Sequence, residues 1–273
     1  MNAGNLFLLI IGIMFSAGCV SPGARPEEHS NMRKFFQKLK CGEEATVAYF
    51  GGSITWGATA TDPLKTSWRA LLAKRLQREF PAARLVPVDA AIGGKGSDLG
   101  VFRMDRDVLP FRPDLTFVEF AVNDAGGGGM TISNQMESIV RQLLALPKIP
   151  VIVFVYTTSK RSLNGEGTAS SCVENAIAAD HAVAENYGIY EVDLNEYVWE
   201  GVKDGKWTWI VRDSKSITDD GTHPNNAGYK VYADRIVELF NRDKSKVFKK
   251  LDPDTPPYCD YVYGEIEEVP FTG

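Results

Sequence analysis

Residues 45–53 read ATVAYFGGS, a short apolar run that ends in two glycines and a serine. A run of this length that glycines terminate is typical of a strand buried in a parallel sheet. Gly51 and Gly52 allow the chain to turn sharply after the strand, and their lack of side chains leaves the hydroxyl of Ser53 open. The segment therefore predicts a strand that delivers a serine to one edge of a sheet.

Strand and helix patterns alternate along the rest of the chain. Further strands are predicted at Leu85–Ile92, Leu115–Val122, Val151–Tyr156 and Ile189–Val192. Helices are predicted at Met32–Leu39, Ser67–Phe80, Ile132–Leu146, Val173–Tyr187 and Asn226–Phe240, and one more from the glycines at 93–96 to Leu109. Such alternation implies a parallel sheet with helices on both faces. We expect an α/β fold, a three-layer α/β/α sandwich with a flavodoxin-like sheet of about five parallel strands.

Length and composition suit one such domain. The chain has 273 residues, and 44% of them are hydrophobic, so we expect a sizeable core and an ordered chain. The formal net charge of −5 argues against a nucleic-acid partner, because phosphate binding needs a clustered basic surface. The charge does not discriminate among small neutral substrates.

The N-terminus has the pattern of an export signal. Leu6–Phe15 is apolar and too short to span a bilayer, and small residues lead from it to Cys19. This pattern resembles a bacterial lipoprotein signal, which implies that Cys19 is lipidated and becomes the mature N-terminus. Ser16 stands where leucine is usual, and Met1–Asn5 carries no Lys or Arg, so ordinary secretion and a retained anchor helix are the alternatives. We expect a cell-envelope protein, lipid-anchored, secreted or periplasmic, that contacts a membrane only through this anchor.

Four regions follow from these patterns: a signal peptide at 1–19, a polar linker at 20–31, the α/β domain at 32–246 and an extended C-terminal arm at 247–273. Prolines at 253, 256 and 257 exclude a helix from the arm. The cysteines are Cys19, Cys41, Cys172 and Cys259. If Cys19 is lipidated, at least one other thiol is free or pairs between chains. No C-x-x-C or Cys/His cluster occurs in the sequence, so we expect no metal site.

Polar or glycine-rich residues follow the first three predicted strands. Ser53, Gly94 and Asn123 each come just after one strand, and ligands of parallel sheets bind at the carboxyl ends of strands. We therefore expect one site that contains all three. Taken alone, the Gly-Gly-Ser tripeptide is also compatible with a turn serine or a helix-capping serine. It lacks the last glycine of the G-x-S-x-G elbow, because Thr55 stands there.

Only three histidines can serve a serine as base: His29, His181 and His223. His29 lies in the linker, and His181 is expected on a helix surface or in helix packing. His223 follows Asp220 by three residues in a turn before the last helix, so both side chains can converge. A serine nucleophile needs a base, and the base needs an orienting partner. The alternative is that His223 only caps the helix.

Taken together, these segments resemble the SGNH (GDSL-like) hydrolase family over roughly residues 45–240. The blocks that carry the resemblance are GGSIT at 51–55, IGG at 92–94, VND at 122–124 and DGTHPN at 220–225. The first block of the family is usually G-D-S, and Gly52 replaces its Asp here. The last block, D-x-x-H-P, is the most specific match.

The resemblance implies a catalytic set in which Ser53 is the nucleophile, His223 the base and Asp220 the residue that orients the imidazole. It also implies an oxyanion hole formed by the N–H groups of Ser53 and Gly94 and the side-chain amide of Asn123. Each such donor contributes roughly 3–4 kcal/mol in the transition state. No metal or organic cofactor is expected.

Two further features are a carboxylate inside a predicted strand and a group of tryptophans near the last block. Glu119 lies inside a predicted strand and needs a partner if it is buried, and Arg103 is a candidate for an internal polar tie. Trp199, Trp207 and Trp209 precede the last block and could stack on a sugar ring, although a loop packed by its own tryptophans is the alternative.

These observations predict an exported serine esterase that hydrolyses short acyl esters, above all acetyl esters on carbohydrates. The predicted partner is a small-molecule or glycan ester. An O-acyltransferase of the same architecture is the alternative within enzymes. A non-catalytic carbohydrate-binding envelope protein is the alternative from another class.

Overall fold

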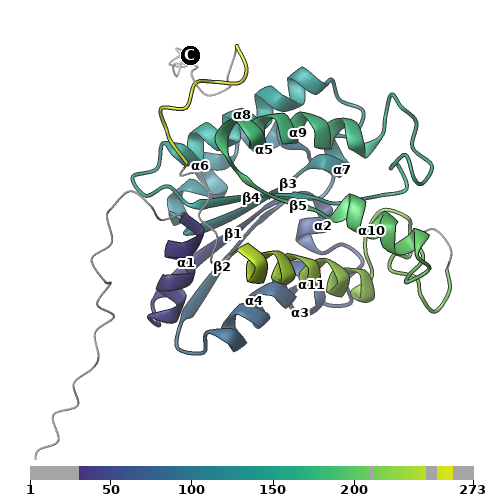
Figure 1. Ribbon diagram of the computed structural model, residues 1–273, viewed down its shortest axis with the longest axis horizontal. Helices are drawn as coiled ribbons and strands as arrows, with labels where there is room; N and C mark the ends of the chain where they lie inside the picture. The colour runs from purple at the N-terminus through teal and green to yellow at the C-terminus, as the bar shows by residue number, and fades with distance from the viewer. Residues whose placement is uncertain (1–30, 210–211, 244–250, 261–273) are drawn as a thin grey trace, which may run out of the picture.

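The computed structural model describes residues 31–209, 212–243 and 251–260. Its centre is a five-stranded parallel sheet with the order β2-β1-β3-β4-β5 (Figure 1). The strands are β1 Glu44–Gly51, β2 Arg84–Ala91, β3 Leu115–Glu119, β4 Val151–Tyr156 and β5 Tyr190–Asp193. This order is that of flavodoxin-like sheets, and the predicted fold class is confirmed.

Helices cover both faces of the sheet, which makes three layers. Figure 1 shows α1, α3, α4 and α11 on one side and α5, α6, α8 and α9 on the other. The long helices are α1 Asn31–Lys40, α4 Trp68–Glu79, α8 Gly129–Leu144, α9 Val173–Tyr187, α10 Leu194–Lys203 and α11 Asn226–Asp243. Short helices are α2 Ser53–Trp56, α3 Pro63–Thr66, α5 Ser97–Val101, α6 Met104–Asp107 and α7 Ala121–Asp124, with a 3-10 turn at Leu109–Phe111.

Strand register places three strand ends at one level. Gly51 of β1 pairs with Ala91 of β2 and with Glu119 of β3, and these are the last residues of their strands. Loops that leave these ends therefore emerge side by side at the carboxyl edge of the sheet. Aromatic side chains fill the core beneath them, where the rings of Tyr49 and Phe117 stack with centroids 5.4 Å apart.

The third strand ends earlier than its apolar sequence predicted. The strand stops at Glu119, and residues 121–124 form the helical turn α7. The N–H groups of Asn123 and Asp124 donate to the carbonyl of Phe120 at 2.8 and 2.9 Å. Short apolar runs do not distinguish a buried strand from a buried helix, which is why the sequence alone misplaced this boundary.

Two helix predictions also need correction. The helix predicted to reach Leu109 is divided into α5, α6 and the 3-10 turn that contains Pro110. Leu194–Lys203, part of which was considered as a loop, forms α10. The carboxylate of Asp193 accepts from the N–H of Glu196 at 2.8 Å and so caps this helix.

The arm predicted at 247–273 is described only over residues 251–260. There the N–H groups of Tyr258 and Cys259 both donate to the buried carboxylate of Glu137 at 2.7 Å, and the Leu251 side chain is buried. The segment is therefore docked on α8, which carries Glu137. The signal peptide at 1–19 and the linker at 20–31, apart from Asn31 at the start of α1, lie outside the described residues.

Among the described residues, no helix is long and apolar enough to cross a bilayer. The same residues contain no group of three His, Cys, Asp or Glu side chains that could hold a metal ion. Cys41 is disulfide-bonded, and Cys172 and Cys259 are buried free thiols.

Candidate active site

The turn that carries Ser53 depends on two glycines. A side chain at Gly51 would place its Cβ 2.5 Å from Oγ1 of Thr55 and 2.6 Å from the carbonyl oxygen of Glu119. A Cβ at Gly52 would lie 2.1 Å from Oδ1 of Asn123. Real Cβ atoms do not approach other atoms this closely, so Gly51 is fixed by the backbone of β3, whereas a larger residue at position 52 would require the Asn123 side chain to move. Gly52, which replaces the Asp of the usual G-D-S block, leaves the space that the Asn123 side chain fills.

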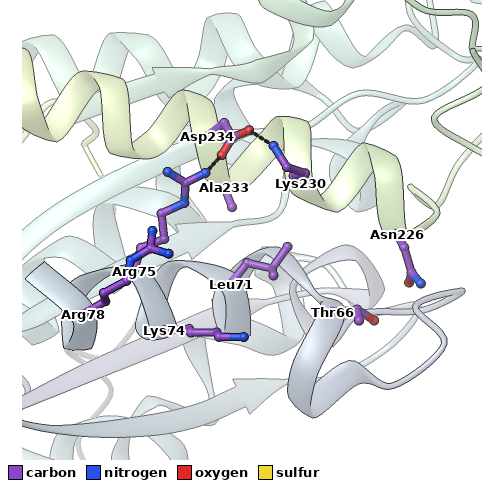
Figure 2. Close-up of a pocket in the computed structure, with 9 residues that line it drawn as sticks. All are labelled: Thr66, Leu71, Lys74, Arg75, Arg78, Asn226, Lys230, Ala233 and Asp234. Atoms are coloured by element: carbon purple, nitrogen blue, oxygen red, sulfur yellow. Dashed lines mark hydrogen bonds and ion pairs between the residues drawn. The ribbon is translucent and has the colours of Figure 1, made fainter.

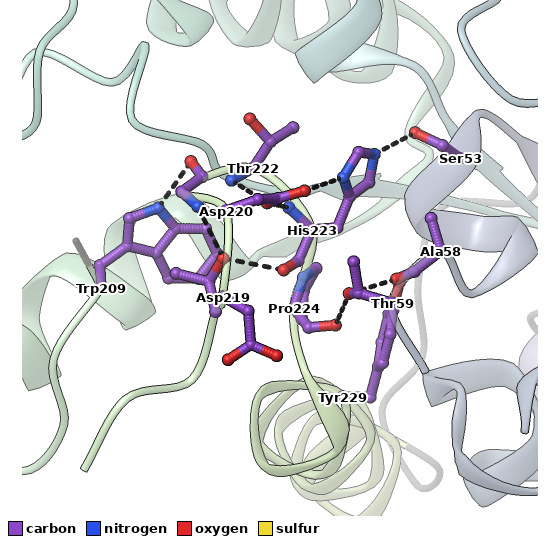
Figure 3. A network of polar contacts seen from close by, with 12 residues as sticks. Ser53, Ala58, Thr59, Trp209, Asp219, Asp220, Thr222, His223, Pro224 and Tyr229 are labelled. Atoms are coloured by element: carbon purple, nitrogen blue, oxygen red, sulfur yellow. Dashed lines mark hydrogen bonds and ion pairs between the residues drawn. The ribbon is translucent and has the colours of Figure 1, made fainter. Parts of the chain in front are cut away.

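Ser53, His223 and Asp220 form one continuous hydrogen-bonded chain (Figure 3). Oγ of Ser53 lies 2.8 Å from Nε2 of His223, and Nδ1 of His223 lies 2.7 Å from Oδ2 of Asp220. The other carboxylate oxygen of Asp220 accepts from the N–H groups of Thr222 and His223 at 2.8 and 2.7 Å. This arrangement matches the geometry of a nucleophile, its base and the group that orients the base.

Hydrogen bonds keep Asp220 ionised. Burial alone would raise the pKa of Asp220, but hydrogen bonds from the His223 side chain and from the N–H groups of His223 and Thr222 lower this pKa below its ordinary value. The carboxylate therefore carries its charge at neutral pH. A charged partner on Nδ1 sets the tautomer in which Nε2 is free to accept the serine proton, and it stabilises the imidazolium that forms.

The turn that carries Asp220 and His223 is held by its own side chains (Figure 3). Oγ1 of Thr218 donates to the carbonyl of His223 at 2.8 Å and accepts from the N–H of Gly221 at 3.0 Å. Nε1 of Trp209 donates to the carbonyl of Gly221 at 3.0 Å. Gly221 has a φ of +79°, a conformation that favours glycine. The turn before α11 is therefore braced from both sides before any substrate binds.

The loop that carries Gly94 runs beside Ser53, and Asn123 lies against Gly52, the residue before the nucleophile. Gly94 is exposed, has a φ of +69°, and has no atom within 4 Å of where its Cβ would be. In the adjacent residue, a Cβ on Gly93 would lie 3.7 Å from Cβ of Ser53, so this loop runs beside the nucleophile. The amide of Asn123 touches the backbone before Ser53 from the other side. The residues predicted to form the oxyanion hole therefore belong to the two segments that adjoin the nucleophile turn.

Asp124, which the sequence analysis left without a role, ties these two loops together. Its Oδ1 accepts from the N–H of Ser97 at 2.9 Å, and burial raises its pKa to about 6. A Cβ on Gly96 would lie 2.1 Å from the same oxygen, so that glycine is needed for the contact. The V-N-D pattern was the signal for this tie, because Asp124 directly follows Asn123.

A second carboxylate, Glu119, lies beneath the nucleophile turn. Its two oxygens accept from the hydroxyls of Thr55 and Thr157, both at 2.7 Å, and the side chain is 1% exposed. Burial raises the pKa of Glu119 to about 7, although the threonine hydrogen bonds oppose the shift. The predicted internal tie exists, and it holds α2 through Thr55.

The predicted partner of Glu119 is wrong. The Arg103 guanidinium instead donates to the carbonyls of Ala90 and Gly51 at 2.6 and 3.2 Å and pairs with Asp107 at 2.9 Å. It also lies over the ring of Phe50, 4.2 Å from the centroid. Arginine has five donors in a fixed fork, which suits these several acceptors, whereas threonine hydroxyls suit the carboxylate.

The tryptophans near the last block pack the protein and do not present open faces to a sugar. Trp209 is 1% exposed and Trp199 is 8% exposed, and Nε1 of Trp199 donates to Oγ1 of Thr158 at 2.8 Å. Trp207 is half-buried, and its Nε1 donates to the carbonyl of Val198 at 2.8 Å. The substrate-stacking prediction for these residues therefore needs correction, because Trp199 packs against Trp209 and the ring of Trp207 packs against Gly201 of α10. The exposed tryptophan is Trp56, on the same helix as Ser53.

His181 lies on the surface, as expected, where its Nδ1 is 2.8 Å from a carboxylate oxygen of Glu191.

A separate cavity of about 320 Å³ lies between α4 and α11 (Figure 2). Its lining is Thr66, Leu71, Lys74, Arg75, Arg78, Asn226, Lys230, Ala233 and Asp234. None of these side chains is a histidine, serine or cysteine, so the cavity has no nucleophile and base of the kind found at Ser53.

Solved structures with the same fold include several esterases. A two-domain esterase active on acetylated mannans, co-crystallised with mannopentaose, is 25% identical with a TM-score of 0.70, and the match covers 84% of this chain and 57% of that chain. The chain thus spans little more than half of that two-domain protein. An acetylxylan esterase from Geobacillus stearothermophilus is 18% identical with a TM-score of 0.61 over 76% of this chain and 99% of that chain, a likeness of fold alone.

No curated protein sequence matches the chain. The model of the GDSL-like Lipase/Acylhydrolase family matches residues 49–231, which is more than half of the chain and includes Ser53, Asp220 and His223. This confirms the resemblance drawn from the four sequence blocks, and the chain belongs to the GDSL-like Lipase/Acylhydrolase family.

Proposed function

We propose that this chain is a serine esterase that removes short acyl groups, acetyl above all, from carbohydrates through an acyl-enzyme on Ser53. The observation that carries the proposal is the continuous chain from Ser53 through His223 to Asp220 at the carboxyl edge of the sheet. A carbohydrate-binding protein without catalysis would need neither the serine–imidazole contact nor the ionised partner behind it.

In the first half of the reaction, Oγ of Ser53 attacks the ester carbonyl while Nε2 of His223 takes its proton. The carbonyl oxygen becomes an oxyanion, which the N–H groups of Ser53 and Gly94 and the amide of Asn123 stabilise. The bond to the alcohol oxygen then breaks, and the imidazolium of His223 gives its proton to the leaving alcohol. The acyl group remains on Ser53.

In the second half, a water molecule gives its proton to His223 and attacks the acyl carbonyl. The carboxylic acid leaves as Ser53 takes the proton back from the imidazolium. Asp220 remains ionised throughout and stabilises the imidazolium in both halves. Every proton in this sequence moves between water, Ser53, His223 and the alcohol, so the steps use no cofactor.

Two observations support an acetylated carbohydrate as the substrate. The esterase active on acetylated mannans and the acetylxylan esterase have the same fold as this chain. The loop beside Ser53 is formed by glycines at 93, 94 and 96, which offer no apolar side chains to sheathe a long acyl chain. A lipase must collect about 0.8 kcal/mol from each buried methylene, and such a loop cannot supply it.

Acetate release tests the proposal directly. Wild-type protein and Ser53→Ala are incubated with acetylated xylan and mannan oligosaccharides, and released acetate is measured. A parallel series of 4-nitrophenyl esters runs from acetate to octanoate. The proposal expects acetate release by the wild type alone, with rates that fall along the series. Rates that climb to octanoate, with no acetate from any glycan, would contradict it.

Hydrolysis and acyl transfer differ in their products. In the same incubations, acetyl groups that appear on a second sugar in place of free acetate would identify an O-acyltransferase. The partial exposure of Ser53 and His223 supports hydrolysis, because water has access to the acyl-enzyme. No specific feature of the described residues favours a second sugar as acceptor.

In this proposal the protein is exported and carries lipid on Cys19. The apolar run at 6–15 and the small residues before Cys19 support it. Mass spectrometry of the N-terminal peptide from the native source is the test. Because Cys41 is disulfide-bonded, the same experiment identifies its partner. A Cys19–Cys41 disulfide peptide would contradict the anchor, since a cysteine that carries thioether-linked lipid cannot form a disulfide.

A further inference from the structure

Trp56 differs from the other tryptophans of this protein. All five lie within the described residues, and Trp56 is 47% exposed, whereas Trp68, Trp199 and Trp209 are buried and Trp207 is half-buried. A single exposed apolar side chain needs no explanation by itself. The position of Trp56 does, because it lies in the same helical turn as Ser53.

The short helix α2 has a buried face and an open face. Ile54 and Thr55 are buried, whereas Ser53 and Trp56 are not. Residues three apart in a helix are neighbours on one face, with Cβ atoms roughly 5–6 Å apart. Helical side chains also lean toward the N-terminus of their helix, and from this tendency we expect the indole of Trp56 to lie over the turn that carries Ser53.

The backbone of Trp56 is held on several sides. Its N–H donates to the carbonyl of Gly52 at 3.0 Å. The buried guanidinium of Arg69 donates to the carbonyls of Thr55 and Trp56 at 3.0 and 3.2 Å, and pairs with Asp89 at 2.6 Å. A residue held in this way loses little backbone freedom when a ligand stacks on its ring.

The residues after Trp56 lead to the catalytic turn. The hydroxyl of Tyr229 donates to the carbonyl of Ala58 at 2.7 Å, and Oγ1 of Thr59 donates to the carbonyl of Pro224 at 2.8 Å (Figure 3). Pro224 directly follows His223, which must protonate the departing alcohol. The loop that starts at Trp56 therefore borders the side of Ser53 where the alcohol half of the ester has to lie.

We infer that Trp56 is the binding platform for the alcohol half of the substrate, on which the pyranose ring that carries the ester stacks. This inference rests on the proposed function and deepens it. An indole face offers a large, rigid apolar surface to the C–H face of a sugar, and its rim leaves the sugar hydroxyls in water. The acyl group points the other way, toward Gly94 and Asn123.

The test compares wild type, Trp56→Ala, Trp56→Phe and Phe111→Ala. Phe111 is the matched control, because it is an exposed aromatic residue that lies just before β3, at the opposite edge of the sheet. Each protein is assayed on acetylated xylo- and manno-oligosaccharides and on ethyl acetate, whose alcohol has no ring. The quantity compared is the ratio of kcat/KM for the glycan to kcat/KM for ethyl acetate.

We expect this ratio to fall about three- to tenfold in Trp56→Ala, the loss of one stacked ring contact, to recover largely in Trp56→Phe and to stay unchanged in Phe111→Ala. Thermal unfolding of each variant controls for folding. An unchanged ratio in Trp56→Ala overturns the inference while the esterase proposal stands. A wild type that releases acetate from ethyl acetate but from no glycan overturns both the carbohydrate substrate and the inference.

A binding measurement gives a readout that does not depend on turnover. Calorimetry compares Ser53→Ala with the double variant Ser53→Ala/Trp56→Ala on the same acetylated oligosaccharides. The inference expects the dissociation constant to rise by a similar factor in the double variant. Equal affinity of the two proteins for every oligosaccharide overturns it.

Discussion

Two carboxylates flank the nucleophile, and their surroundings differ in every respect. The Asp220 side chain is 42% exposed on a surface turn, whereas Glu119 is 1% exposed at the end of β3. Burial raises the pKa of Glu119 to about 7, and hydrogen bonds overcome the effect of burial to lower the pKa of Asp220. From this comparison we expect Asp220 to act through its charge and Glu119 to act through the two hydroxyls whose hydrogen bonds it accepts.

The largest effect is expected at the nucleophile and base, which lie between the two carboxylate-containing networks. Ser53→Ala and His223→Ala should each lower kcat/KM for an acetate ester by about three orders of magnitude or more, because no other histidine of the described residues reaches the serine. Ser214→Ala and His181→Ala are matched controls on the surface and should retain full rate. A variant of Ser53 or His223 that keeps more than about a tenth of the wild-type rate would refute the assignment.

Removal of the charge alone tests the first half of the comparison. Asp220→Asn should lower kcat by about two to four orders of magnitude with little change in KM, because the amide can still accept from the backbone but cannot stabilise the imidazolium. Asp219→Asn, its exposed neighbour, is the control. If Asp220→Asn loses less than about fivefold in kcat, the charge of Asp220 is not what the imidazole requires.

Removal of the hydrogen bonds that Glu119 accepts tests whether Glu119 acts through the two threonine hydroxyls. Glu119→Leu leaves the hydroxyls of Thr55 and Thr157 buried without partners, so the free energy of unfolding should decrease by about 2–4 kcal/mol. Because α2 is then held less firmly, kcat should fall about tenfold. Glu119→Gln keeps an acceptor and a donor for the two hydroxyls and should retain most of kcat. Denaturant unfolding and kcat at saturating substrate are the measurements. Equal loss of kcat in both variants would mean that Glu119 also acts through its charge.

The smallest effect is the pH dependence of stability, which should have opposite signs at the two residues. The folded pKa of Glu119 lies above the ordinary 4.5, so its stabilisation is fully present below about pH 4.5 and is lost as pH rises toward about 7, by up to about 3 kcal/mol. The folded pKa of Asp220 is lowered, so its stabilisation is present above its ordinary value of about 3.8 and is lost as pH falls further.

These slopes are isolated by subtraction of variants measured under the same conditions. The free energy of unfolding of wild type minus that of Glu119→Gln should fall between pH 4.5 and 7. The same difference for Asp220→Asn should decrease as the pH is lowered below about 4. Other buried acids titrate in both proteins of each pair, so their contributions cancel. A flat difference for Glu119→Gln would mean that its carboxyl has an ordinary pKa in the folded protein.

Local sequence patterns were sufficient to predict the contacts between residues that share one turn. The interval from Asp220 to His223, and the glycines before Ser53, made these contacts predictable because both are set within a few residues of backbone. The meeting of the ends of β1, β2 and β3, from which the segments with Ser53, Gly94 and Asn123 leave, was also predictable, since parallel strands place their carboxyl ends at one edge. The end of β3 was not predictable, because an apolar run does not show where a buried strand stops and a buried helix begins.

The sequence by itself determined the layered α/β/α fold, the order of its elements and the pairing of Ser53 with His223 and Asp220. Only the tertiary structure decided which long-range partners side chains meet. In the folded protein Glu119 accepts hydrogen bonds from Thr55 and Thr157, and Arg103 donates to backbone carbonyls. Trp199 and Trp209 are buried, whereas Trp56 is exposed in the same helix as Ser53. The physical reason is that helices and strands are specified by the pattern of neighbouring residues, whereas the burial of a side chain and its hydrogen-bond partners depend on how separate elements pack together.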